Sequence, residues 1–176
     1  ELVDMMMRPP YEGSTLFAKV LNVWLIGQAP ARAHRNRVEY LTRTLVEEAV
    51  RARSLGRAGR VYNLGCGPAA EIQRFLKEQA VADQMRFTLL DFNEETLVHL
   101  RTTLEGVKRT YARSTPIQFL KHSVQQVLKE AGKSVPRTPD NEYDFIYCAG
   151  LFDYLSDQLC KRLMNIFYNL LAPGGL

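Results

Sequence analysis

One stretch of the chain reads Val61-Tyr62-Asn63-Leu64-Gly65-Cys66-Gly67-Pro68-Ala69-Ala70-Glu71. A short apolar run ends there in two glycines, and apolar residues at helical spacing follow at once. Glycine suits a tight turn because its backbone reaches dihedral angles that other residues avoid, and because it lets a ligand approach closely. The stretch therefore predicts a strand, a tight turn and a helix, with Pro68 at the first helical position.

A second candidate strand ends in a carboxylate. The run Arg86–Leu90 leads directly into Asp91. In a sheet of this kind, an acidic side chain at that strand end lies where the ribose of a bound nucleoside is held. The glycine turn and Asp91 together predict a site for a cofactor that contains a nucleoside.

Strands and helices alternate through the rest of the chain. Beyond the first strand, we expect strands at 86–90, 117–121 and 143–148, and helices at about 69–79, 94–107, 123–131 and 155–170. A polar loop is expected at 132–141. This alternation predicts an α/β fold with a Rossmann-like, doubly wound and mostly parallel sheet, because each strand pair is joined by a right-handed helical crossover.

Two further helices are expected before the sheet, at 14–27 and 31–54, after an irregular arm over residues 1–13. We therefore divide the chain into an arm with a helical lid, 1–58, and a cofactor-binding core, 59–176. The sequence ends at Leu176, where a fifth strand is expected to begin, so the last strands of such a fold are absent from it. We expect the native protein to continue beyond this residue.

Composition is that of a globular protein: 176 residues, 46% hydrophobic and 24% charged, with a formal net charge of +4. The three cysteines, Cys66, Cys148 and Cys160, form no Cys-x-x-Cys pair. This pattern favours a reducing compartment, hence the cytoplasm, and predicts no metal site. The longest apolar-rich run, Leu16–Ile26, is too short to span a bilayer.

Two cofactors fit the glycine pattern. The spacing Gly65-x-Gly67-x-x-Ala70, with Asp91 as the distal acid, satisfies a dinucleotide fingerprint and keeps NAD as an alternative. Pro68, however, removes a backbone donor from the turn, and Glu71 puts negative charge where a phosphate would bind. S-adenosylmethionine has no phosphate and carries a cationic sulfonium, so the balance favours S-adenosylmethionine.

Ordered motifs from about Arg60 to Leu176 resemble those of class I S-adenosylmethionine-dependent methyltransferases. They are Asn63-Leu64-Gly65-Cys66-Gly67, Leu90-Asp91-Phe92-Asn93, Lys121-His122-Ser123, Tyr143-Asp144-Phe145-Ile146-Tyr147-Cys148 and Leu171-Ala172-Pro173-Gly174-Gly175. The resemblance implies cofactor binding by Asn63, Gly65, Cys66, Gly67, Asp91, Phe92, Asn93, His122, Ser123, Cys148 and Ala149.

Within that set, the resemblance implies that Gly65 and Gly67 pass under the methionine moiety, Asp91 accepts from the ribose hydroxyls, and Phe92 lies along the adenine. His122 and Ser123 fall where the family reads the adenine edge, and the segment from Cys148 falls beside the transferable methyl group. Asn63 stands where the family commonly has an acidic residue. Either 122 or 123 is often Asp in the family, so His122 and Ser123 imply an adenine contact through backbone groups.

A narrower resemblance concerns the acceptor. The segments 28–37 and 148–155 are similar to those of bacterial methyltransferases that make 3-hydroxy fatty acid methyl esters. This implies methyl transfer to the carboxylate of a small molecule. The candidate acceptor-site residues are His34, Arg35 and Tyr154, because a guanidinium can hold a carboxylate in bidentate fashion. A solvated or capping role for His34 and a core position for Tyr154 are equally compatible with the sequence.

Two other functions stay open at this stage. The arginines of residues 32–60 would suit an RNA acceptor, although a hydrated helix face explains them as well. A non-catalytic Rossmann-like module is the other alternative. The oligomeric state leaves no signature in the sequence.

Overall fold

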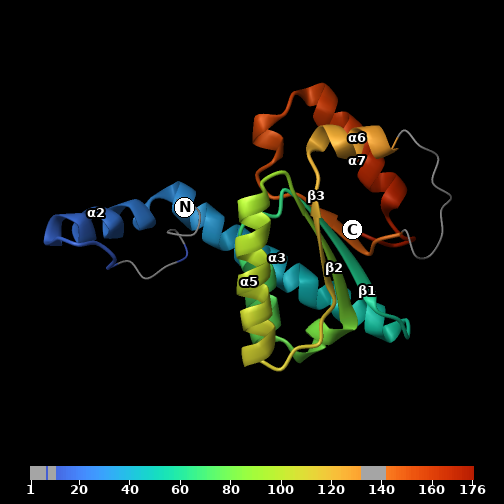
Figure 1. The fold of residues 1–176 in the computed structure, drawn as a ribbon, viewed down its shortest axis with the longest axis horizontal. Helices are drawn as coiled ribbons and strands as arrows, with labels where there is room; N and C mark the ends of the chain where they lie inside the picture. Colours follow the sequence, from blue (N-terminus) through green and yellow to red (C-terminus); the bar gives the residue numbers. More distant parts are fainter. Residues whose placement is uncertain (1–6, 8–10, 132–141) are drawn as a thin grey trace. The chain divides into compact units, whose positions relative to one another are not determined.

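The computed structural model describes residue 7 and residues 11–131 and 142–176 (Figure 1). The chain divides into two compact units, Glu1–Thr44 and Leu45–Leu176. The predicted loop at 132–141 and most of the predicted arm at 1–13 lie outside the described residues. The division between the units falls within a helix, and the predicted domain limits at 58 and 59 stay a prediction.

Two helices account for most of the first unit. Helix α2 spans Leu16–Gly27, and Thr15 caps it by accepting a hydrogen bond from the Ala18 N–H at 3.1 Å. Helix α3 spans Ala29–Ser54 and continues into the second unit. It begins two residues earlier than the sequence predicts, because a proline in the first turn needs no N–H partner and Pro30 is therefore tolerated there.

The second unit is built on four parallel strands, β1 (Gly59–Leu64), β2 (Met85–Asp91), β3 (Ile117–Lys121) and β4 (Phe145–Tyr147), in the order β3-β2-β1-β4. The crossovers contain α4 (Ala70–Glu78), α5 (Glu94–Thr110) and α6 (Val124–Ala131), and α7 (Asp157–Leu170) follows β4. Short 3-10 helices lie at Ala80–Gln84 and Phe152–Tyr154. The predicted doubly wound parallel sheet is confirmed.

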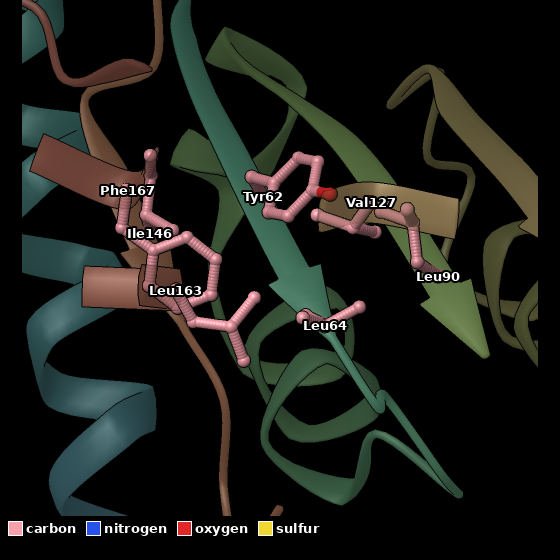
Figure 2. Packing of buried hydrophobic residues seen from close by; sticks show 7 residues of the cluster. All are labelled: Tyr62, Leu64, Leu90, Val127, Ile146, Leu163 and Phe167. Atoms are coloured by element: carbon pink, nitrogen blue, oxygen red, sulfur yellow. The ribbon is translucent and has the colours of Figure 1, made fainter. Parts of the chain in front are cut away.

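Both faces of this sheet are covered. On one face, Phe75 of α4 packs edge-on against Phe87 of β2, and Arg101 of α5 lies over the Phe119 ring of β3. Helices α6 and α7 cover the other face (Figure 1). Figure 2 shows the core on that side, which contains Tyr62, Leu64, Leu90, Val127, Ile146, Leu163 and Phe167. Burial of such apolar side chains drives the closure of the layers.

Several local predictions are corrected. Pro68 lies in the turn, and α4 begins at Ala70 after Ala69 takes a left-handed conformation with φ of 45°. Strand β4 covers only Phe145–Tyr147, and α7 begins at Asp157 rather than at Leu155. The segment Phe152–Tyr154 before α7 forms a 3-10 helix, and Leu155 lies between the two helices.

Residues 170–176 follow the outer edge of β4. The Leu176 N–H donates to the Asp144 carbonyl, and the Leu176 carbonyl accepts from the Ile146 N–H, both at 2.9 Å. This alternation is the pattern of parallel strands. Leu176 therefore occupies the place beside β4 at which a fifth strand was predicted to begin.

A buried carboxylate organises the amino end of the sheet. Asp144, 1% exposed, accepts hydrogen bonds from Arg51 at 3.0 Å, from Arg57 at 2.7 Å and from the Arg60 N–H at 2.9 Å. Burial alone would raise the pKa of Asp144, but the Arg57 guanidinium and the Arg60 N–H lower it. The last turns of α3 are thereby tied to the start of β4. No helix in the described ranges is both long and apolar enough to cross a membrane.

Candidate functional site

The glycine turn joins β1 to α4 and keeps its hydrogen bonds to itself and to β2. Gly65 and Gly67 have φ of 69° and 50°, angles that glycine adopts without strain. The N–H groups of Gly65 and Cys66 donate to the Leu90 carbonyl, at 2.8 and 3.0 Å, and the Ala69 N–H donates to the Cys66 carbonyl at 3.0 Å. A Cβ placed on Gly67 would meet no atom within 4 Å in the part of the chain that the structure describes. Hydrogen bonds to the end of β2 therefore fix the turn, and there is free space beside the Cα atom of Gly67.

Asp91 lies beside this turn, as the sequence predicted. The residue is 7% exposed. Its carboxylate accepts hydrogen bonds from the Gly67 N–H at 3.1 Å and the Asn93 N–H at 3.0 Å. Each carboxylate oxygen can accept more than one hydrogen bond. Asp91 is therefore held in place by backbone donors and keeps acceptor capacity for a ligand hydroxyl.

A second buried carboxylate lies under the same turn. Glu71, in the first turn of α4, accepts from the Tyr147 hydroxyl at 2.7 Å and from the Asn63 side-chain amide at 3.4 Å. Asn63 and Tyr147 face each other across β1 and β4 in the sheet register. Burial, followed by the negative charge of Glu71, raises the pKa of Tyr147, so its hydroxyl stays protonated as a donor.

Other predicted cofactor residues cap the helices that begin at this edge. The Asn93 side chain accepts from the Glu95 N–H at 2.9 Å and the Thr96 N–H at 3.4 Å. Ser123 and Gln126 form reciprocal hydrogen bonds at the start of α6. Both residues thus have a structural role at their predicted positions, and their contacts with a cofactor stay predictions.

The side chains of Phe92 and His122 lie at the same sheet edge. Phe92, which directly follows the strand end at Asp91, is 73% exposed. The His122 N–H donates to the Asp91 carbonyl at 3.0 Å, and its ring nitrogen Nδ1 lies 3.6 Å from a Glu130 carboxylate oxygen. The exposed ring of Phe92 is accessible to a ligand, and its contact with the adenine stays a prediction.

The cysteines of this region are protonated thiols. Burial raises the pKa of Cys66, and burial together with the neighbouring Cys160 raises the pKa of Cys148 to about 11. A thiol with that pKa is a poor nucleophile at neutral pH, because the thiolate is the reactive form. Cys148 and Ala149 follow β4 directly, so they lie at the predicted strand end as small residues rather than as a nucleophilic centre.

The candidate acceptor residues of the first unit contact other residues of that unit. Arg35 donates to the Ile26 carbonyl at 2.9 Å, at the end of α2. Arg37 lies 2.8 Å from the His34 Nδ1 atom, and burial followed by the charges of Arg37 and Arg35 lowers the pKa of His34. His34 is thus a neutral imidazole at neutral pH, and Arg35 has a capping role that the sequence did not indicate.

Tyr154 is not a core residue. It belongs to the short 3-10 helix after β4 and is 87% exposed. The alternative that Tyr154 fills the core is wrong, because the residue is exposed to solvent. Its role at an acceptor site stays a prediction.

Sequence reasoning missed two residues of this edge. Glu71 was weighed only as an obstacle to phosphate, and Tyr147 only as part of a strand. The signal that could have found them is positional, since a buried strand-end tyrosine needs a hydrogen-bond partner and the first turn of α4 offers one. Within the described ranges, no group of three or more His, Cys, Asp or Glu side chains is placed to hold a metal ion.

Most of the second unit matches a known protein family. The family model described as a methyltransferase domain matches residues 61–175. A search of curated proteins found no match.

Solved structures share the fold at low sequence identity. A protein described as a possible exported protein, from Bordetella parapertussis, is 19% identical with a TM-score of 0.63, over 97% of this chain and 49% of that one. Magnesium protoporphyrin IX methyltransferase from Synechocystis PCC 6803 with bound SAM is 13% identical with a TM-score of 0.56, over 96% and 65%. Small RNA methyltransferase HEN1 is 14% identical with a TM-score of 0.54, over 76% and 15%. The chain thus spans less than two thirds of the length of each.

Proposed function

Since the chain belongs to the methyltransferase domain family, we propose that it binds S-adenosylmethionine and transfers the methyl group to a small molecule. The magnesium protoporphyrin IX methyltransferase that shares its fold was solved with SAM and with SAH bound, which supports this choice of cofactor. The chain's own residues supply a second, independent argument.

The hydrogen bonding of the glycine turn carries the proposal. A pyrophosphate bound at such a turn needs free backbone N–H groups. Here Gly65, Cys66 and Ala69 donate to carbonyl oxygens, Gly67 donates to Asp91, and Pro68 has no N–H. Residues 65–69 therefore leave no N–H for a dinucleotide phosphate, whereas S-adenosylmethionine carries no phosphate. This argument favours the adenosyl cofactor over NAD.

The remaining groups fit an adenosyl ligand. Asp91 accepts from the ribose hydroxyls, Phe92 covers the adenine, and backbone groups near His122 and Ser123 meet the adenine edge. The open space at Gly67 lets the ligand lie close to the backbone, where a side chain would interfere. When bound, S-adenosylmethionine supplies an electrophilic methyl group on a positively charged sulfur.

The protein's contribution to such a transfer is to position the acceptor and exclude water. A carboxylate acceptor needs no general base, and neither protonated thiol of the site provides one. We extend the proposal to a fatty acid carboxylate, such as that of a 3-hydroxy fatty acid. Its support is the composition of the first unit, where Leu16, Val20 and Trp24 of α2 are exposed and apolar and α3 adds arginines. A cytoplasmic location, where free thiols persist, belongs to the same proposal.

Calorimetric titration tests the cofactor assignment. We expect S-adenosylmethionine and S-adenosylhomocysteine to bind the wild type and NAD not to bind. Asp91→Asn removes the charge that strengthens the ribose hydrogen bonds, so it should weaken S-adenosylhomocysteine about tenfold. Asp157→Asn, on the exposed first turn of α7, is the matched control and should leave affinity unchanged. Binding of NAD in place of both adenosyl ligands would overturn the proposal.

A transfer assay tests the acceptor. We expect methyl esters to form when the protein is incubated with S-adenosylmethionine and long-chain 3-hydroxy fatty acids. Esters should not form from the corresponding fatty alcohols, which lack the carboxylate. If RNA is methylated in the same assay and no ester forms, the acceptor is RNA and the fatty acid proposal is wrong.

A further inference from the structure

Helix α2 turns its apolar side toward solvent. Successive residues of an α-helix are rotated by about 100° around its axis, so the exposed apolar side chains of α2 fill one arc of about 200°. They are Leu16, Phe17, Val20, Leu21, Val23, Trp24 and Leu25, with exposures from 41% to 80%. A helix of a globular protein ordinarily packs such a stripe against the core. We call this surface the apolar arc of α2.

The opposite side of α2 is the side that the protein covers. Asn22 is buried, and Ala18 and Ile26 are half-buried. These three residues recur at every fourth position, so they share one side of the helix. The covered side thus contains the polar Asn22, while Trp24 and its apolar neighbours face water. A contiguous exposed apolar surface of this kind marks a site of interaction, whereas single exposed apolar residues do not.

The length of α2 and the charge around it indicate the kind of partner. Its 12 residues extend over about 18 Å, less than the roughly 30 Å of a bilayer's hydrocarbon core, so α2 can lie in a membrane surface but not cross it. Residues 16–44 of the first unit include a single acidic residue, Glu39. Their basic residues are Lys19, Arg32, Arg35, Arg37 and Arg43. The apolar arc is therefore accompanied by an excess of positive charge.

This charge favours an anionic partner over a second copy of the chain. Two copies that met through α2 would bring like charges together, and like charges repel. Acidic phospholipid headgroups attract lysine and arginine, and the boundary of headgroups and acyl chains accepts the apolar side of a helix. Tryptophan is common at that depth, because its ring is apolar and its N–H is polar. Trp24 and Lys19 suit the two layers of such a surface.

We propose that α2 docks the protein on the surface of an anionic phospholipid bilayer. The apolar arc lies at the level of the upper acyl chains, and the basic residues of 19–43 lie among the headgroups. A fatty acid acceptor would reach the protein from the same surface. Vesicle binding needs neither cofactor nor acceptor, however, so this inference goes beyond the proposed function and does not rest on it.

The fluorescence of Trp24 tests the docking directly, because this is the only tryptophan of the chain. The protein is titrated with vesicles of phosphatidylglycerol and phosphatidylcholine in equal parts, and with vesicles of phosphatidylcholine alone. We expect the emission to move to shorter wavelength, and to become shielded from acrylamide, with the anionic vesicles only. Salt at about 0.5 M should weaken this binding at least about tenfold, because it screens the attraction between basic residues and headgroups.

Two matched pairs of variants assign the binding to α2. Val20→Glu puts a charge into the apolar arc and should weaken binding to the anionic vesicles at least about tenfold. Val98→Glu adds the same charge on α5, at a site of similar exposure, and should leave binding unchanged. Lys19→Gln should weaken binding about fivefold, and Lys161→Gln on the exposed side of α7 should not. Circular dichroism checks that each variant is folded.

The outcomes decide between the possible partners of α2. A shift that is confined to anionic vesicles and lost in Val20→Glu supports the bilayer. The inference is wrong if anionic vesicles leave the Trp24 emission unchanged, or if Val20→Glu and Val98→Glu weaken binding equally. If the emission instead shifts with protein concentration alone, and ultracentrifugation shows a dimer that Val20→Glu separates, a second copy covers α2. The cofactor titrations are independent of all these results, so failure of the proposed function is recognised separately.

Discussion

The two ends of the sheet hold buried carboxylates in opposite ways. At the amino end, Asp144 is bound by two guanidinium groups and a backbone N–H. At the carboxyl end, Asp91 is held by backbone N–H groups, and neutral side chains donate to Glu71. The amino end also leaves its acceptor satisfied, whereas at the carboxyl end the buried Oδ1 atom of Asn63 has no hydrogen-bond partner among the described residues.

This contrast separates a structural carboxylate from a binding one. The Asp144 carboxylate accepts four hydrogen bonds within the protein, and removal of one partner of such a buried ion pair is destabilising. At the carboxyl end the hydrogen bonds shown to the carboxylates come from neutral groups, and the unsatisfied amide oxygen of Asn63 beside them costs stability. Departures from good local bonding of this kind concentrate at functional sites. The carboxyl end is therefore where we expect substitutions to change binding, and the amino end is where we expect them to change stability.

The largest effect on stability is expected at the amino end. Asp144→Asn keeps the size of the side chain but leaves Arg51 and Arg57 without their buried counter-charge. Because these arginines are partly exposed and regain water, we expect a loss of about 2–3 kcal/mol in the free energy of unfolding. Urea denaturation at neutral pH measures it, with Asp153→Asn on the exposed 3-10 helix as the control.

The pH dependence sharpens this prediction. The pKa of Asp144 is lowered in the folded state, so the carboxylate stabilises the fold above its unfolded pKa of about 3.9. That contribution disappears as the pH falls through the folded pKa. The stability difference between wild type and Asp144→Asn should therefore be largest near neutral pH and should shrink below about pH 4. A difference that does not change with pH would mean that the Asp144 charge is not what ties α3 to β4.

Local sequence signals predicted much of the fold and part of the site. The period of apolar residues located all four strands, and the run from β2 into Asp91 placed a carboxylate next to the glycine turn. These features depend on neighbours in the sequence, which a pattern can show. Asn93 and Ser123 were placed at the right edge, but their helix-capping hydrogen bonds were not foreseen, although both residue types are strong helix N-caps.

Contacts between distant segments could not be predicted in this way. Asp144 meets Arg51 and Arg57 across 93 and 87 positions, and Tyr147 meets Glu71 across 76. These side chains come together only through the pairing of strands and the packing of helices in the fold. The sequence around a charged residue at the start of a strand does not indicate which distant residue will pair with it. The same limit explains why Glu71 was interpreted from its helix position alone, as an obstacle to phosphate.

The smallest predicted effect compares one alanine at each end of the sheet. Ala69 precedes α4 at the carboxyl end, and Ala112 follows α5 toward the amino end; their φ angles are 45° and 50°. Ala112 stands where a helix end favours glycine, since the Arg113 N–H reaches back to the Lys108 carbonyl at 2.8 Å.

Glycine relieves the left-handed strain at both positions, but Ala69 is 1% exposed and would also lose a buried methyl group, a cost of about 0.8 kcal/mol. We therefore expect Ala112→Gly to raise the free energy of unfolding by about 0.5–1 kcal/mol and Ala69→Gly to leave it nearly unchanged. Urea denaturation of both variants measures the difference. An equal gain at both positions would show that the buried methyl group of Ala69 adds no packing energy.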